Sequence, residues 1–167
     1  AVQAAVLNVK LPYLPKWINQ RYEIARRYID SLKDIPALQM PIIDKANNSL
    51  HSCNQFVVKI KKDFIDASYS NELNSLPNNI LCNLPDSRSR DWLKNNLAKR
   101  GINTIIYYPI PIHLQPAYKK DLFDIKSLKN SENLSSNVLS LPMFPELSIS
   151  MQEYVIQNIR ELLLEIS

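Results

Sequence analysis

The sequence predicts an α+β domain in which a small sheet packs against helices. Apolar residues recur at helical spacing in two stretches, residues 16–32 and residues 150–166. Between them, the run QFVVKIK (55–61) alternates in the way that a half-buried strand does. The 167 residues suffice for one hydrophobic core, so we treat 1–167 as a single domain.

The N-terminal part, residues 1–33, is expected to be a long kinked helix. Residues 1–11 place apolar side chains at helical spacing with no N-cap before them, so they look like part of a buried helix and the chain like a piece of a longer protein. Pro12 and Pro15 kink or restart the helix. The apolar stripe that follows consists of Ile18, Tyr22, Ala25, Ile29 and Leu32. The basic residues beside it favour a solvated face over a phosphate-binding face.

The central part of the chain holds one clear strand between two polar stretches. Residues 34–50 contain two prolines and an Asn pair, which predicts a connection. The strand at 55–61 follows. Residues 62–86 are rich in Asn and Ser and are predicted to form a surface insertion, in which 80–84 could make a short edge strand.

A helix is predicted to follow this insertion. Ser87 or Ser89 can cap it, and Leu93 and Leu97 are expected to be buried. Gly101, the only glycine of the chain, comes directly after the helical pattern. A residue without a Cβ adopts the left-handed conformation at low cost, so Gly101 is expected to end the helix.

The next segment, RGINTIIYYPIPIHLQPAY (100–118), is the best candidate for a binding surface. Its residues 102–107 alternate and predict a strand, which the prolines at 109 and 111 stop. The stiff part that follows carries aromatic and polar side chains, among them Tyr107, Tyr108 and His113. The alternative is that these tyrosines only cover the core, and composition alone favours that alternative.

Two helices are expected in the C-terminal part. The first, at 130–139, would begin at Asn130 or Ser131 and turn Leu134 and Val138 inward. An extended apolar stretch (139–147) follows. The residues SMQE (150–153) form a capping-box pattern, which predicts the start of the last helix.

Composition excludes several classes of function. The net charge of +4 is modest and mixed in sign along the chain, which gives no support for nucleic-acid binding. No apolar run is long enough to span a membrane. Two isolated cysteines and two histidines make a metal site improbable and suggest reduced thiols in a cytoplasmic protein. A single glycine excludes a glycine-rich phosphate loop, and no nucleophile–base pair is evident, so no catalytic residue is assigned.

Four segments, in order, resemble the C-terminal half of the DegT/DnrJ/EryC1/StrS family. These are VQAAVLNVKLPYLPKWINQRYEIARRY (2–28), HSCNQFVVKI (51–60), residues 100–118, and SENLSSNVLSLPMFPELSISMQEYVIQNI (131–159). The runs YP-x-P-x-H-x-QPAY and LSLPM-x-PEL are the most specific of these matches. The similarity extends over nearly the whole chain apart from residues 62–86.

The resemblance implies a fold, a cofactor and a reaction. The fold would be the small C-terminal domain of the aspartate aminotransferase (fold type I) architecture, with a small, mostly antiparallel sheet and helices on one face. The parent enzyme would use pyridoxal 5'-phosphate to move an amino group from glutamate to a nucleotide-linked keto sugar. It would be a cytoplasmic homodimer without metal, nucleic acid or membrane.

The same resemblance places the Schiff-base lysine and most cofactor contacts in a large domain upstream of residue 1. Residues 1–33 would link the chain to that domain. This chain alone would therefore bind no cofactor and be inactive.

Residue by residue, the resemblance supplies only candidates for substrate binding. The family pattern G-x-x-[ST]-x-x-H-Y-P matches at Gly101 and Thr104, but Tyr107 stands where histidine is usual. That change removes a group that titrates near neutral pH. Asn54 likewise replaces a frequent histidine. The resemblance implies that Tyr107, Tyr108 and His113 line the edge of the substrate cleft.

Two other functions stay open from the sequence. Some relatives replace the lysine and dehydrate the sugar, and the residue that decides lies upstream. The chain could instead be a stand-alone, non-catalytic binding or assembly domain. If a large domain is missing, residues 1–11 and 102–112 should expose apolar side chains.

Overall fold

The structure is a computed structural model of the chain, and it describes residues 1–43, 51–61, 88–118 and 128–164. The predicted insertion at 62–86 and its proposed edge strand lie outside the described residues. The elements in chain order are α1 (Val2–Lys10), η1 (Leu11–Tyr13), α2 (Leu14–Leu32), β1 (Leu38–Gln39), β2 (Phe56–Ile60), α4 (Arg88–Lys99), η3 (Ile112–Leu114), η4 (Pro116–Tyr118), α5 (Lys129–Asn137), β3 (Val138–Leu141) and α6 (Ile149–Leu164).

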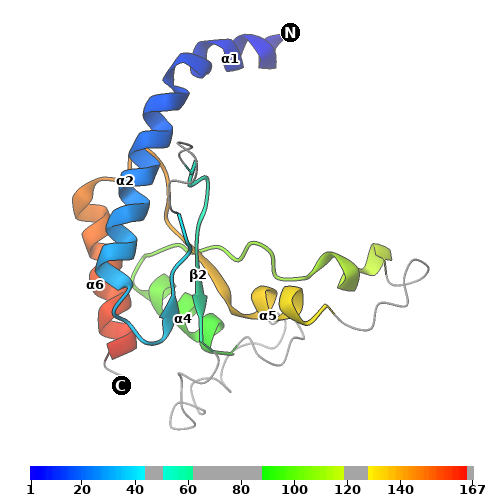
Figure 1. Cartoon of the computed structure of the whole chain (residues 1–167), viewed down its shortest axis with the longest axis vertical. Coiled ribbons are helices and arrows are strands. Elements are labelled where there is room, and N and C mark those ends of the chain that lie inside the picture. Colours follow the sequence, from blue (N-terminus) through cyan, green and yellow to red (C-terminus); the bar gives the residue numbers. More distant parts are fainter. Residues whose placement is uncertain (44–50, 62–87, 119–127, 165–167) are drawn as a thin grey trace.

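The sheet is small and antiparallel, as predicted, with the strand order β1-β2-β3. In the central strand β2, Phe56 pairs with Leu141 and Val58 with Leu139. All four residues are buried. Because directly opposite residues of an antiparallel pair point to the same face of the sheet, these four side chains mark its buried face. Helices α2 and α6 run side by side along that face (Figure 1). Strand β1 was not predicted, because two residues between prolines give no periodicity to read.

The core joins β2 to α2 and α6. Phe56 stacks on Tyr28 of α2, with ring centroids 5.1 Å apart. The Tyr28 hydroxyl donates a hydrogen bond of 3.1 Å to the carbonyl of Pro142, and burial raises the pKa of this phenol. Gln152 of α6 is buried and donates from Nε2 to the carbonyl of Ile24 at 2.7 Å. These contacts fix the helix pair over one face of the sheet.

Helix α1 is exposed along its whole length, so the prediction of a buried helix is wrong for this chain. Figure 1 shows α1 projecting away from the sheet, beyond the upper end of α2. Val2 is 79% exposed and Val9 is 69% exposed. Large apolar residues are also exposed between residues 102 and 112, so both regions expected to show apolar surface do show it. Such surface calls for a covering partner.

The predicted strand at 102–107 does not form. Only Ile105 pairs with β3, where it exchanges two backbone hydrogen bonds with Ser140, of 2.8 and 3.2 Å. Ile102 and Thr104 are buried while Asn103 and Ile105 are exposed. The alternating pattern thus comes from an extended segment that buries every second side chain. It is not a strand, because the segment pairs with β3 at one position only.

Gly101 ends α4 as predicted, with φ of +75°. The Ile102 N–H bonds the carbonyl of Leu97 at 2.9 Å, and the Gly101 N–H bonds the carbonyl of Ala98 at 2.9 Å. This pair of bonds is a Schellman motif, and the accompanying apolar contact comes from the buried Ile102 and Leu97.

Gly101→Ala is expected to lower the free energy of unfolding by about 1–2 kcal/mol. A Cβ at this position would meet no atom within 4 Å, so the loss comes from backbone strain alone. Gly101→Asn should lose less, because Asn tolerates the left-handed conformation. Urea unfolding of the three proteins measures the difference, and equal stability of the Ala variant would contradict this account.

Two predicted helix starts are corrected by the structure. Helix α5 begins at Lys129, and Glu132 accepts the Leu128 N–H at 3.1 Å in place of a cap from Asn130 or Ser131. Helix α6 begins at Ile149, because Ser148 rather than Ser150 accepts the Met151 N–H, at 3.2 Å. In α5 a side chain of the first turn bonds back to the N-cap residue, and in α6 the serine just before the helix takes the place of the one inside it.

The inward face of α5 also differs from the prediction. Leu134 is 49% exposed, while the buried residues of the helix are Ser135, Ser136 and Asn137. Val138 is buried as expected, but it belongs to β3. The Ser136 hydroxyl and the Asn137 side-chain nitrogen donate to backbone carbonyls four residues earlier, whereas Oδ1 of Asn137 has no partner.

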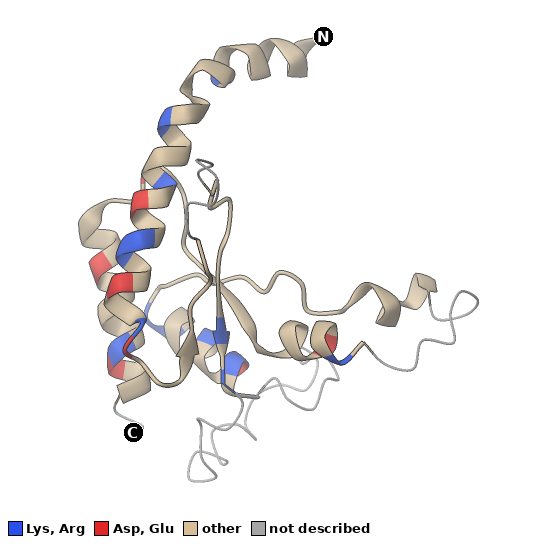
Figure 2. Ribbon diagram, in the orientation of Figure 1, with Lys and Arg blue, Asp and Glu red and all other residues tan. Residues whose placement is uncertain are grey.

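Charged residues of both signs are interspersed over the described elements, most visibly along α2 and α6 (Figure 2). Arg160 of α6 forms a bidentate ion pair with Asp34, with distances of 2.7 and 2.8 Å. This guanidinium lowers the pKa of the Asp34 carboxyl. None of the helices in the described ranges is long and apolar enough to cross a membrane.

Candidate functional site

Two hollows lie on either side of the segment that follows Gly101. The first hollow, of about 830 Å³, is bounded by residues 101–107, residues 140–147 and the first turns of α6. The second hollow, of about 860 Å³, lies between residues 108–118 and α5. Both fall within the size range of small-molecule sites in proteins.

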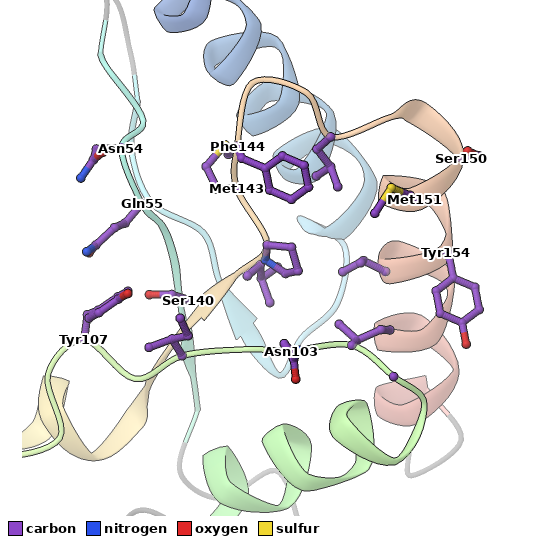
Figure 3. Close-up of a pocket in the computed structure, with 17 residues that line it drawn as sticks. Asn54, Gln55, Asn103, Tyr107, Ser140, Met143, Phe144, Ser150, Met151 and Tyr154 are labelled. Atoms are coloured by element: carbon purple, nitrogen blue, oxygen red, sulfur yellow. The ribbon is translucent and has the colours of Figure 1, made fainter. Parts of the chain in front are cut away.

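The first hollow has a polar end and an apolar end (Figure 3). The apolar end is formed by the loop after β3 and by α6, with Met143, Phe144, Leu147, Met151 and Tyr154. The polar end carries hydroxyl and amide side chains, namely Asn54, Gln55, Tyr107 and Ser140, while Asn103 lies further along the segment toward α6. No charged side chain lines this hollow among the residues that the structure describes. Its chemistry is therefore that of a neutral, partly apolar ligand.

The sheet register explains how the polar end is assembled. Ser140 pairs with Val57 on one side and with Ile105 on the other, so these three side chains share one face of the sheet. Gln55, two residues before Val57, and Tyr107, two residues after Ile105, line the same hollow as Ser140. The shared face is opposite to the face that α2 and α6 cover. Three distant parts of the chain thus deliver polar groups to one open surface.

Ser140 lines the first hollow and has a buried side-chain hydroxyl without a hydrogen-bond partner. Its residue is 5% exposed, and its backbone N–H and carbonyl both bond Ile105. Its Oγ has no hydrogen-bond partner. A buried hydroxyl without a partner costs about 1–3 kcal/mol. Figure 3 shows the Ser140 hydroxyl and the ring of Tyr107 pointing toward each other across the polar end.

One residue that lines the second hollow, His113, pairs with Glu132 of α5. The His113 Nε2 lies 3.0 Å from Oε1 of Glu132, and the His113 side chain is 9% exposed. The same carboxylate oxygen accepts the Leu128 N–H. The proline-rich segment is thereby held against the start of α5. Apolar residues, among them Ile110, Ile112 and Tyr118, form most of the remaining wall.

The structure separates the three residues predicted to bind substrate. Tyr107 lines the first hollow, whereas Tyr108 and His113 line the second. The two tyrosine rings meet edge to face, with centroids 5.5 Å apart. One segment, residues 100–118, therefore contributes side chains to both hollows. The sequence did not single out Ser140 or Gln55, although a serine inside the apolar run LSLPM was a detectable signal.

A cysteine–histidine pair lies close to the first hollow. The Cys53 N–H donates to Nδ1 of His51 at 3.0 Å, and the Cys53 Sγ lies 3.4 Å from the same nitrogen. Cys53 has φ of +45° and is buried, and burial raises the pKa of its thiol. A thiol that is buried and protonated is a poor nucleophile. We therefore interpret this pair as part of the turn that leads into β2.

Pyridoxal phosphate, which the family resemblance implies, does not fit the described residues alone. The cofactor needs an amine for the Schiff base and an acidic partner for its ring nitrogen. The described lining of the two hollows holds neither a lysine nor a carboxylate. No chemical step through the cofactor is therefore derived from these residues.

Curated relatives match almost the whole chain. A pleiotropic regulatory protein of Geobacillus stearothermophilus is 30% identical over 160 residues, which are 96% of this chain and 36% of that protein. The dTDP-3-amino-3,4,6-trideoxy-α-D-glucose transaminase of Streptomyces venezuelae is 29% identical over 160 residues, 96% of this chain and 35% of that protein. The chain thus spans little more than a third of the length of these relatives.

Structural comparison agrees with the sequence comparison. The crystal structure of a DegT DnrJ EryC1 StrS aminotransferase from Brucella abortus matches 97% of this chain and 35% of its own, with a TM-score of 0.73 and 33% identity. The sequence model of the DegT/DnrJ/EryC1/StrS aminotransferase family matches residues 1–76 and 70–160. On this evidence the chain belongs to the DegT/DnrJ/EryC1/StrS aminotransferase family.

Proposed function

We propose that this chain is the C-terminal domain of a pyridoxal-phosphate-dependent aminotransferase, which moves an amino group from glutamate to a nucleotide-linked keto sugar. The observation that carries the proposal is the match of the family over nearly all of the chain, together with a curated relative that is a dTDP-amino-sugar transaminase. The parent would be a cytoplasmic homodimer. The lysine and the phosphate contacts would come from the rest of that protein, so the domain alone would be inactive.

The role of this domain would be to form one wall of the substrate cleft. Tyr107 at the first hollow, and Tyr108 and His113 at the second, remain the proposed substrate contacts. His113 is held in place by Glu132, which fixes the orientation of its ring. A wall built from a stiff, proline-rich segment can position a sugar without moving.

The exposed apolar residues of α1 agree with this role. Val2, Leu7 and Val9 are each more than 60% exposed, although nothing in a solvated helix requires apolar residues there. We propose that a further domain of the parent covers them. A stand-alone binding or assembly domain would also need a partner over this helix, so the family match, and not this surface, favours the enzyme proposal.

The proposal is tested on the native gene product, isolated from its source cell and identified by intact mass and peptide sequencing. We expect a mass well above 19.3 kDa and a Schiff-base lysine upstream of residue 1. With pyridoxal phosphate and glutamate, it should convert a dTDP-linked keto sugar into the amino sugar, as detected by mass spectrometry. Dehydration instead of amination, with histidine at the lysine position, would establish the dehydratase alternative. A native product whose first residue is residue 1 would refute the enzyme proposal for this chain.

A further inference from the structure

The open face of the sheet contains an unsatisfied group that no fold contact explains. Ser140 is nearly buried, both of its backbone groups are bonded, and its Oγ has no partner. A strand interior normally holds an apolar residue at such a position. A hydroxyl there is costly to the fold unless a ligand or a water completes it.

The surroundings of Ser140 indicate the chemistry of such a ligand. The Tyr107 side chain points toward it in Figure 3, and Gln55 lines the same hollow. A hydroxyl and a phenol can each donate and accept one hydrogen bond, and an amide offers both functions. Sugar hydroxyl groups need partners of this mixed kind. Exposed apolar side chains such as Ile105 supply a surface for the C–H face of a ring.

Among the described residues, the polar end of the first hollow lacks the groups that bind phosphate, because the N-terminal turns of α6 line only its other, apolar end. Proteins bind diphosphates with Arg, Lys or helix N-terminal amides. The polar end of the first hollow offers Ser140, Tyr107, Gln55 and Asn54, all of them neutral. A nucleotide-linked sugar that entered the hollow would therefore place its neutral ring, and not its diphosphate, at this end.

From this geometry we propose that the polar end of the first hollow binds the hexose ring of the nucleotide-linked substrate, with the Ser140 Oγ as a specificity-determining hydrogen-bond partner. This inference rests on the proposed function for the class of substrate. It goes further by assigning the ring to the open face of the sheet. Ser140 binds in this proposal and takes no part in proton transfer.

The test uses Ser140→Ala in the native protein, with Thr104→Val as the matched control. Thr104 is also buried and its Oγ1 also lacks a partner, but it does not line the hollow. Isothermal titration calorimetry is done with dTDP-glucose and UDP-glucose, and separately with dTDP and UDP. Within each pair the free nucleotide lacks the hexose and ends in a free phosphate, and none of the four ligands carries the keto group needed for amino transfer.

We expect Ser140→Ala to weaken binding of the sugar nucleotide by about three- to tenfold, which is the worth of one hydrogen bond. Binding of dTDP or UDP should not change, and Thr104→Val should change neither. The melting temperature of Ser140→Ala should be equal to that of the wild type or higher, because an unpaired buried hydroxyl is removed. A purely structural serine would instead give a lower melting temperature and no selective loss of sugar binding.

Three outcomes would overturn the inference. They are an equal loss for the nucleotide and the sugar nucleotide, no loss for either, or no difference between dTDP-glucose and dTDP in the wild type. The inference and the proposed function can fail separately. Normal amino transfer without a selective effect at Ser140 refutes only the inference, whereas a selective effect in a protein that dehydrates its sugar refutes only the proposed reaction.

Discussion

Arg90→Met is expected to lower the free energy of unfolding by about 3–5 kcal/mol. Arg90 is 1% exposed, and its guanidinium bonds the Asp91 carboxylate through Nε at 2.9 Å and Nη2 at 2.8 Å. Nη1 also donates to the backbone carbonyl of Ser135, which ties α4 to α5. Removing the cation leaves the Asp91 carboxylate buried without a counter-charge. Its second oxygen, Oδ2, already lacks a partner.

Urea unfolding followed by circular dichroism measures this loss, and Lys99→Met is the matched control. Lys99 lies at the other end of the same helix and is exposed, so the same change there should alter stability little. The double variant Arg90→Met/Asp91→Leu should recover most of the loss, because a buried ion pair can be replaced by apolar residues at small cost. A single variant as stable as the Lys99 control would show that the pair does not matter for folding.

Phe56→Ala is expected to lower the free energy of unfolding by a comparable amount, about 3–5 kcal/mol. Phe56 is 1% exposed at the start of the central strand and stacks on Tyr28, so truncation opens a cavity between the sheet and α2. Both of its walls belong to regular elements, which can collapse only partly into the space.

The neighbouring residue supplies the control for this second variant. Val57 is half-buried on the open face of the sheet, where solvent can fill the space that a smaller side chain leaves. Val57→Ala should therefore cost clearly less than Phe56→Ala in the same urea titration. If the two variants were equally stable, the helices would not form the core on the face of Phe56.

The elements with strong local patterns could be predicted from the sequence. Helix α2, strand β2 and helix α6 follow from residue spacing, because one side of each is buried continuously against the core. Gly101 could be predicted as a helix end, since its conformation is a local property. The family could be recognised from its motifs in four ordered segments.

The candidate site depended on contacts that local patterns do not contain. Tyr107, Tyr108 and His113 are close in sequence, but Tyr107 lines one hollow and the other two line another. Ser140 became a candidate only when the register placed it between Val57 and Ile105. A serine inside an apolar run looks like an ordinary strand residue until it is known that the serine is buried and that its hydroxyl has no hydrogen-bond partner.

For this protein, the sequence by itself determined the α+β class, the main helices and the family, because periodicity and motifs are properties of short stretches. The tertiary structure decided which side chains meet: Arg90 with Asp91 and Ser135, His113 with Glu132, and Ser140 with the open face of the sheet. It also decided that residues 102–107 form a single bridge instead of a strand. Pairing and burial depend on partners distant in the chain, and spacing along one segment carries no information about them.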